Sequence, residues 1–169
     1  MTNDEILQER REKLSKIPLF KSFSSDKESL SRINEVCTIK DYEKDSVVIA
    51  EGESGDDMFI VFDGSVEIRK RTRSGDEYTV VQLSAEHNVF FGELAIVSDG
   101  ERSATVITKC KSTFLVISKK DFEDFCEEYP KIGLAITREI LKTVAARLRK
   151  TNDDMLTIFD ALMNEIKNS

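Results

Sequence analysis

The residues of this chain best suited to chemistry are a glycine, a glutamate and an arginine within one short stretch. Gly92 and Arg102 stand ten residues apart, and Glu93 follows the glycine directly. Glycine lets the backbone approach a neighbour closely. The turn at 93–97 has helical composition, and the first turn of a helix presents free N–H groups and a positive dipole end to an anion. The planar guanidinium adds donors that suit a phosphate, so the stretch predicts a site for one small anion.

Taken alone, this stretch allows a second interpretation. Gly-Glu-Leu-Ala at 92–95 is a common string. An arginine near a glutamate is usually a surface pair that contributes little to stability. The elements that position these residues therefore decide between the two interpretations.

Residues 37–118 carry the pattern of a β-barrel or jelly roll. Short β-branched and aromatic runs alternate with turn residues at near-regular spacing, which is typical of such folds. We expect strands at Cys37–Tyr42, Ser46–Ala50, Met58–Phe62, Ser65–Thr72, Tyr78–Leu83, Ala104–Thr108 and Thr113–Ile117. Asp63-Gly64 and Gly75-Asp76 are the strongest candidates for hairpin turns.

Helices are expected on both sides of the barrel. Residues 4–16 are charged with interspersed apolar residues and should form an amphipathic helix that ends before Pro18. Ser25-Asp26-Lys27-Glu28 fits a capping box for a second helix that runs to about Val36. Ser118 should begin a further helix that Pro130 breaks.

The region after Pro130 has the composition of one long helix of roughly 35 residues, about 50 Å in length. Its apolar residues recur at steps of three and four, close to a heptad seam. They are Leu141, Val144, Leu148, Met155, Ile158, Leu162 and Ile166, with Thr151 in the gap. The alternative is a helix that lies on its own barrel, and we favour the seam because so long a helix would overhang the domain.

Composition limits the function classes. The 169 residues suffice for one domain with a proper core, and 40% apolar against 34% charged residues indicate a soluble globular protein. The net charge of −7 makes nucleic acid an unexpected partner. There is no run long enough to cross a bilayer and no signal peptide, so we expect no membrane partner and a cytoplasmic location.

Cysteine and histidine usage argues against metal and nucleophile chemistry. Cys37, Cys110 and Cys126 fit neither a disulfide framework nor a zinc pattern, and each is interpreted as a small packing residue. His87 is the only histidine, which excludes a multi-histidine metal centre and removes the commonest general base. We therefore expect no catalysis, no metal and no cofactor, and a cupin-like enzyme on a similar jelly roll is disfavoured.

Two long motifs in order resemble the cyclic-nucleotide-binding domain family, which includes catabolite activator proteins and kinase regulatory subunits. The first is Glu51-Gly52-Glu53-Ser54-Gly55-Asp56-Asp57-Met58-Phe59-Ile60-Val61, followed by Asp63-Gly64-Ser65-Val66. The second is Phe91-Gly92-Glu93-Leu94-Ala95-Ile96, then Arg102-Ser103-Ala104-Thr105-Val106. The resemblance covers roughly residues 14–152. It implies a double-stranded β-helix barrel at 37–118 with a phosphate-binding cassette at 91–106, N-terminal helices at 1–36 and C-terminal helices at 119–169.

The resemblance assigns roles within the cassette. Arg102 would pair with the cyclic phosphate, and Glu93 would accept a hydrogen bond from the ribose 2′-hydroxyl, which requires Arg102 nearby to offset the carboxylate. The remaining candidate ligand residues of the cassette are Gly92, the backbone N–H groups of Leu94 and Ala95, Ser103 and Ala104. Asp99 and Glu101 are expected to face water.

The base contact would come from the long C-terminal helix. Thr151 and Asn152 fall where activator proteins place a Thr and a Ser against adenine, one of them from the partner subunit. A tolerated polar residue in the seam is the alternative for Thr151. Cyclic AMP is the preferred ligand. Ser103 keeps cyclic GMP as the alternative, because a hydroxyl directly after the arginine favours guanine in some relatives.

The resulting hypothesis is a cyclic-nucleotide sensor that signals through movement of its C-terminal helix. A homodimer through that helix and an unidentified effector protein are the expected partners. The alternative function is a scaffold that has kept the fold, lost the nucleotide and acts as a protein-interaction module. The chain shows no effector domain, so it is either part of a larger regulator or a small protein that works through a partner; its start at Met1 and its polar end favour the second.

Overall fold

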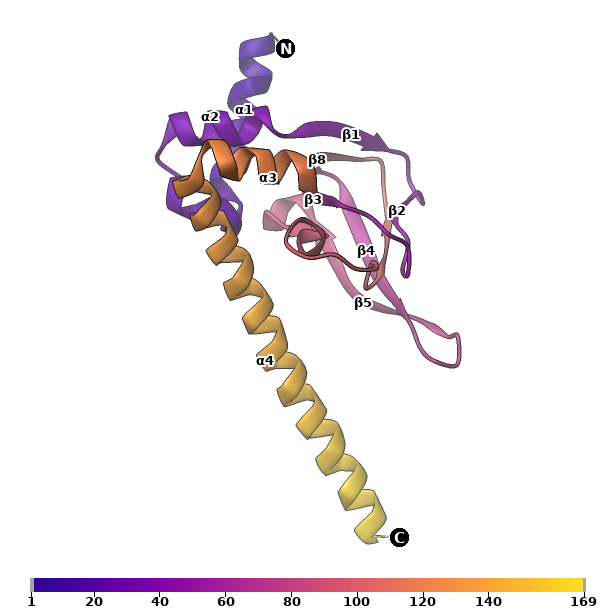
Figure 1. Ribbon diagram of the computed structural model, residues 1–169. Coiled ribbons are helices and arrows are strands. Elements are labelled where there is room, and N and C mark those ends of the chain that lie inside the picture. Colours follow the sequence, from indigo (N-terminus) through magenta and orange to yellow (C-terminus); the bar gives the residue numbers. More distant parts are fainter. Residues whose placement is uncertain (1, 169) are drawn as a thin grey trace.

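The computed structural model describes residues 2–168, and its helices gather on one side of a β-barrel (Figure 1). The N-terminal elements are α1 (Asn3–Lys16), the 3₁₀ helix η1 (Pro18–Phe23) and α2 (Lys27–Glu35). A capping box does occur, but at the start of α1, between Thr2 and Glu5. The box expected at 25–28 is wrong: Asp26 caps α2, because its carboxylate accepts from the N–H groups of Glu28 and Ser29, each at 3.1 Å.

Two four-stranded antiparallel sheets form the barrel, which confirms the expected jelly-roll fold. One sheet has the order β1-β8-β3-β6 and the other the order β2-β7-β4-β5. The strands are β1 (Thr38–Tyr42), β2 (Val47–Ile49), β3 (Asp57–Asp63), β4 (Ser65–Arg71), β5 (Glu77–Ser84), β6 (Phe90–Phe91), β7 (Thr105–Thr108) and β8 (Ser112–Ser118). The short helices η2 (Ala85–His87) and η3 (Glu93–Ile96) flank β6. The sequence pattern predicted seven of these strands and missed β6.

One of the two expected hairpins is wrong. β4 and β5 pair directly around the turn that contains Gly75-Asp76, as predicted. Asp63-Gly64 instead carries the chain from one sheet to the other, because β3 pairs with β8 and β6 while β4 pairs with β5 and β7. Gly64 has φ +88°, and a Cβ built there would lie 2.3 Å from the Ser112 hydroxyl oxygen, so the position needs glycine.

Strand β3 separates two apolar clusters because alternate side chains of a strand point to opposite faces. Met58 and Ile60 belong to the cluster shared with the helices, whereas Phe59 and Val61 belong to the cluster inside the barrel. Both faces of the strand are thus buried, which explains its nearly continuous apolar sequence. The shared cluster fixes the helical layer against one wall of the barrel.

The cysteines only partly match the expectation of packing residues. Cys37 is buried, and burial raises the pKa of its thiol to about 12. Cys126 is half-buried in α3 against Gly133 of α4. Cys110 is exposed, so the packing interpretation is wrong for it.

The chain ends in α3 (Lys119–Glu128) and α4 (Pro130–Asn168). The Ser118 side chain caps α3, and Pro130 separates the two helices, as expected. The first turns of α4 are anchored through the buried Gly133, Ile136 and Ile140. The rest of its 39 residues, about 58 Å in all at 1.5 Å per residue, extends past the barrel (Figure 1).

The exposed part of α4 rules out the alternative of a helix packed along its own barrel. Four residues of the expected seam, Leu141, Leu148, Met155 and Ile158, are 60–69% exposed. Among the described residues, no helix is both long enough and apolar enough to cross a membrane.

Candidate functional site

The predicted cassette begins where the chain leaves the barrel wall. β6 pairs with β3, so that Phe91 lies opposite Phe59 and their rings stack with centroids 5.2 Å apart. The next residue, Gly92, turns the backbone at φ +75° into η3. A Cβ at this position would lie 2.9 Å from the carbonyl oxygen of Asp57 and 3.0 Å from Nη1 of Arg102. Both the left-handed backbone and the close approach therefore require glycine.

Arg102 reaches the same place from the far end of the cassette. Its backbone is fixed on the β2–β3 loop: its N–H donates to the carbonyl of Glu53 at 2.8 Å, and its carbonyl accepts from the N–H of Gly52 at 2.9 Å. Its guanidinium donates from Nη2 to the carbonyl of Asp57 at 2.9 Å. The side chain packs so tightly against Gly55 that a Cβ there would lie 2.6 Å from Nε. Gly92 and Arg102 are thus brought together, as the sequence predicted.

The guanidinium lines a small cavity of about 190 Å³ in the mouth of the barrel. One wall is apolar, formed by Ile49, Phe59 and their neighbours, and the other is polar, formed by the β2–β3 loop. Partial burial lowers the pKa of Arg102, although the nearby carboxylates of Asp57 and Asp56 oppose the shift. An arginine side chain stays charged at neutral pH even so, and the cavity therefore presents a partly desolvated cation.

Glu93 is buried, with 2% of its surface exposed, but its cation is not the expected one. Its Oε1 accepts a hydrogen bond from Nη1 of Arg147, on α4. Arg102 lies near, since its Nη1 is beside Gly92, but the ion pair of this carboxylate is with Arg147, and the guanidinium of Arg102 donates to the carbonyl of Asp57. Arg147 is the functional residue that the sequence analysis missed. The available signal was its place on the long helix, four residues before Thr151 and so on the same face.

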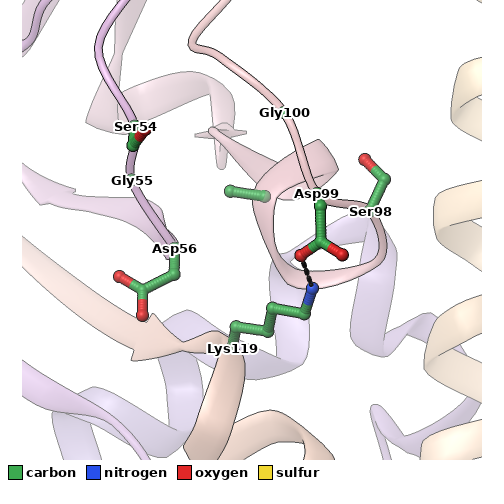
Figure 2. A pocket seen from close by; sticks show the side chains of 8 residues that line it. Ser54, Gly55, Asp56, Ser98, Asp99, Gly100 and Lys119 are labelled. Carbon is green, nitrogen blue, oxygen red and sulfur yellow. Dashed lines mark hydrogen bonds and ion pairs between the residues drawn. The ribbon is translucent and has the colours of Figure 1, made fainter.

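A second, outer cavity of about 420 Å³ lies on the other side of Gly55. Figure 2 shows Lys119, the first residue of α3, reaching across its floor to Asp99 at the tip of the cassette, with Nζ and Oδ1 2.5 Å apart. The backbone N–H of Lys119 donates to the carbonyl of Asp56 at 2.7 Å. The hydrogen bond from Lys119 lowers the pKa of Asp99. The Asp99 and Glu101 side chains are exposed to water, as predicted.

The remaining candidate residues of the cassette differ in exposure and in the use of their donors. The N–H of Ala95 donates to the carbonyl of Gly92 at 3.1 Å, so that donor is used inside the turn rather than presented to a ligand. Leu94 is 41% exposed, Ser103 is exposed and Ala104 is half-buried.

Thr151 and Asn152 do not reach the inner cavity within one chain. Both side chains are exposed on α4, one turn beyond Arg147. A contact between them and a ligand in the barrel would require either movement of α4 or a second chain.

Comparison with known proteins agrees with this geometry. The sequence model of the family described as "Cyclic nucleotide-binding domain" matches residues 39–129, which include β3, the cassette and α3. The chain is 36% identical over 93 residues to a cAMP-dependent protein kinase regulatory subunit from Mycosarcoma maydis, covering 55% of this chain and 17% of the relative. It is 31% identical over 117 residues to a CRP-like cAMP-activated global transcriptional regulator from Mycobacterium tuberculosis, covering 68% of this chain and 49% of the relative.

Solved structures extend the likeness to the whole fold. A cyclic nucleotide-binding domain from Methylobacillus flagellatus superposes with a TM-score of 0.75 at 24% identity, covering 90% of this chain and 84% of that one. The chain spans half or less of the length of the curated relatives named above. Its sequence and its fold together place it in one group: the chain belongs to the cyclic nucleotide-binding domain family.

Proposed function

We propose that this domain binds a cyclic nucleotide, cyclic AMP in preference to cyclic GMP, and acts as a sensor without catalysis. Support comes from the partly desolvated guanidinium of Arg102 at the mouth of the barrel, which can neutralise a singly charged cyclic phosphate. The apolar wall beside it suits a sugar and base. The relatives include proteins named for cAMP and a cGMP-dependent protein kinase, so the choice between the two nucleotides is left to the binding experiment.

The observation that carries a signalling role is the bond between the buried Glu93 and Arg147 of α4. A ribose hydroxyl that donates to Glu93 would compete with Arg147 or join it at the same carboxylate. Either outcome changes how firmly α4 is held against the cassette. A ligand shifts a conformational equilibrium only through its different affinity for the two states, and this shared carboxylate supplies such a difference.

The exposed seam of α4 supports a homodimer as part of the same proposal. Residues 141–162 place apolar side chains on one face at steps of three and four, and most of them are over half exposed in the single chain. Pairing of two helices along this seam would bury them. It would also bring Thr151 and Asn152 of one helix beside the other chain, where they become candidate base contacts.

The proposal is tested by titration calorimetry of the purified protein with cyclic AMP, cyclic GMP and cyclic dinucleotides. We expect Arg102→Leu to weaken cyclic AMP binding tenfold to hundredfold, about 1.4–2.8 kcal/mol. Arg73→Leu is the matched control, because Arg73 is an exposed arginine in the β4–β5 turn. Unchanged affinity in Arg102→Leu would refute the assignment of the phosphate site.

The scaffold alternative makes the opposite prediction in a thermal melt. A ligand at 100 times its dissociation constant should stabilise the folded state by about 2.7 kcal/mol. A melting temperature that no cyclic nucleotide raises would favour a protein-interaction module that has lost the ligand. Recovery of the nucleotide unchanged after incubation checks the absence of catalysis.

A further inference from the structure

The last three turns of α4 carry a second apolar stripe beside the seam. Its three residues recur at steps of three and four, and they are 62%, 60% and 38% exposed; in order they are Leu156, Phe159 and Met163. Residues three and four apart are neighbours on a helix surface. The three side chains therefore form one continuous exposed strip.

Pairing of two helices along the seam leaves Leu156 and Met163 of this strip uncovered. Leu156 and Met163 each follow a seam residue, Met155 and Leu162, by one position, which rotates them about 100° around the helix. A two-stranded coil buries the seam positions and leaves these positions in water.

In the first half of α4, charged residues occupy the heptad position that Leu156 and Met163 occupy in the second half. Lys142 and Arg149 occupy the same place in the two preceding heptads, directly after Leu141 and Leu148. Both are charged, as expected for a solvated face. The change from charged to apolar residues at one heptad position therefore distinguishes the distal segment of α4 from the first half of the helix.

The outer edge of the strip is acidic. Asp153 and Asp160 are exposed, lie seven residues apart and flank Leu156 at spacings of three and four. Within the described part of the chain, neither carboxylate takes part in an ion pair. Segment 153–167 contains four acidic residues and one basic residue, a net charge of −3.

We propose that this strip docks an amphipathic helix with basic flanks, supplied by a partner protein. Its apolar side chains would pack between Leu156, Phe159 and Met163, and its lysines or arginines would meet Asp153 and Asp160. The α4 helix of another copy of this chain would be a poorer occupant, because its own acidic residues would lie against Asp153 and Asp160. This partner site belongs with the pairing of α4 in the proposed function, but it is measured separately from nucleotide binding.

The test uses the full chain and a fluorescent synthetic helix of about 18 residues, or five turns. The probe has leucines at helical spacing and lysines on both flanks. A comparison peptide keeps the leucines and replaces the lysines with glutamates. Anisotropy titrations should show the lysine peptide binding at least about tenfold more tightly, a difference of about 1.4 kcal/mol.

The variant Leu156→Glu with Met163→Glu should weaken binding of the lysine peptide at least about tenfold. Thr157→Glu with Asn164→Glu is the control, since it adds the same charges at the same spacing about 100° further around the helix, outside the strip. Sedimentation and cyclic AMP titration of both variants should match the unaltered protein.

Four results would overturn the proposal. These are absence of binding by the lysine peptide, equal binding by the glutamate peptide, equal loss in both variants, and a changed assembly state in the Leu156/Met163 variant. The last would assign the strip to self-association. Loss of nucleotide binding alone would instead count against the proposed function.

Discussion

Replacement of Arg147 by leucine should destabilise the fold, because it leaves the carboxylate of Glu93 buried without its cation. The glutamate side chain is 2% exposed and the arginine side chain 57% exposed, so water reaches one partner only. A hydrogen bond to a charged group contributes about 1.5–3 kcal/mol. Loss of one partner of a fully buried pair costs about 3–5 kcal/mol, an upper bound here because Arg147 is half in water. We therefore expect a loss of about 1.5–3 kcal/mol.

Thermal and urea unfolding measure this loss directly. For a domain of this size each kcal/mol lowers the melting temperature by about 2–4 °C, so the expected shift is about 3–12 °C. Lys150→Leu is the control: Lys150 pairs with Asp154 on the same helix, and both side chains are at least 60% exposed. That exposed pair should contribute about 0.3–0.5 kcal/mol.

A variant that lacks both charges distinguishes the contribution of the Glu93–Arg147 interaction from the other effects of each substitution on stability. The double variant Glu93→Gln with Arg147→Leu should lose less stability than the sum of the two single variants, since no buried charge is then left alone. The reasoning fails if Arg147→Leu melts within about 1 °C of the unaltered protein, or if Lys150→Leu costs as much.

Two further substitutions probe the inner cavity and the barrel wall. Gly55→Ala should weaken cyclic AMP binding about tenfold, because the added Cβ would lie 2.6 Å from Nε of Arg102 and displace the guanidinium; calorimetry that gives an unchanged affinity would contradict this. Glu67 is 5% exposed, and hydrogen bonds from Arg69, Lys109 and Thr79 lower its pKa from 4.5 to about 2. Since the folded-state pKa is the lower one, its contribution to stability is present above pH 4.5 and is lost as the pH falls towards 2. Glu67→Gln should melt lower than the unaltered protein at pH 7, and the two melting curves should converge near pH 2; parallel curves from pH 7 to 2 would show that the group does not contribute in this way.

The barrel strands were predictable because their side chains follow local rules of burial. Strand β6 was missed because two residues, Phe90 and Phe91, are too few to show a period. The dipeptide Asp63-Gly64 indicates that the chain changes direction, but it does not specify which strand the next one pairs with. That choice depends on β8, which pairs with β3 from about fifty residues further along the chain.

The candidate site likewise combines residues that are close in the sequence with one that is far along the chain. Gly92 and Arg102 lie in one short stretch, and their proximity follows from a cassette that returns to the same loop. The partner of Glu93 is 54 residues away in the chain, and its identity depends on the direction of α4 after Pro130. No local pattern encodes that direction. The heptad spacing of α4 was readable, but the sequence could not show how much of the helix would stay uncovered.

The hydrogen bond between Arg102 and the carbonyl of Asp57 bears on which ligands the proposed site would favour. In the proposed function, a cyclic phosphate that binds Arg102 in the cavity of about 190 Å³ would take the place of this carbonyl. A cyclic phosphate replaces a neutral carbonyl with a charged acceptor, and hydrogen bonds between two charged groups are the stronger kind. A neutral nucleoside would displace the same carbonyl without that compensation. We therefore expect a cyclic nucleotide to bind more tightly than the matching neutral nucleoside.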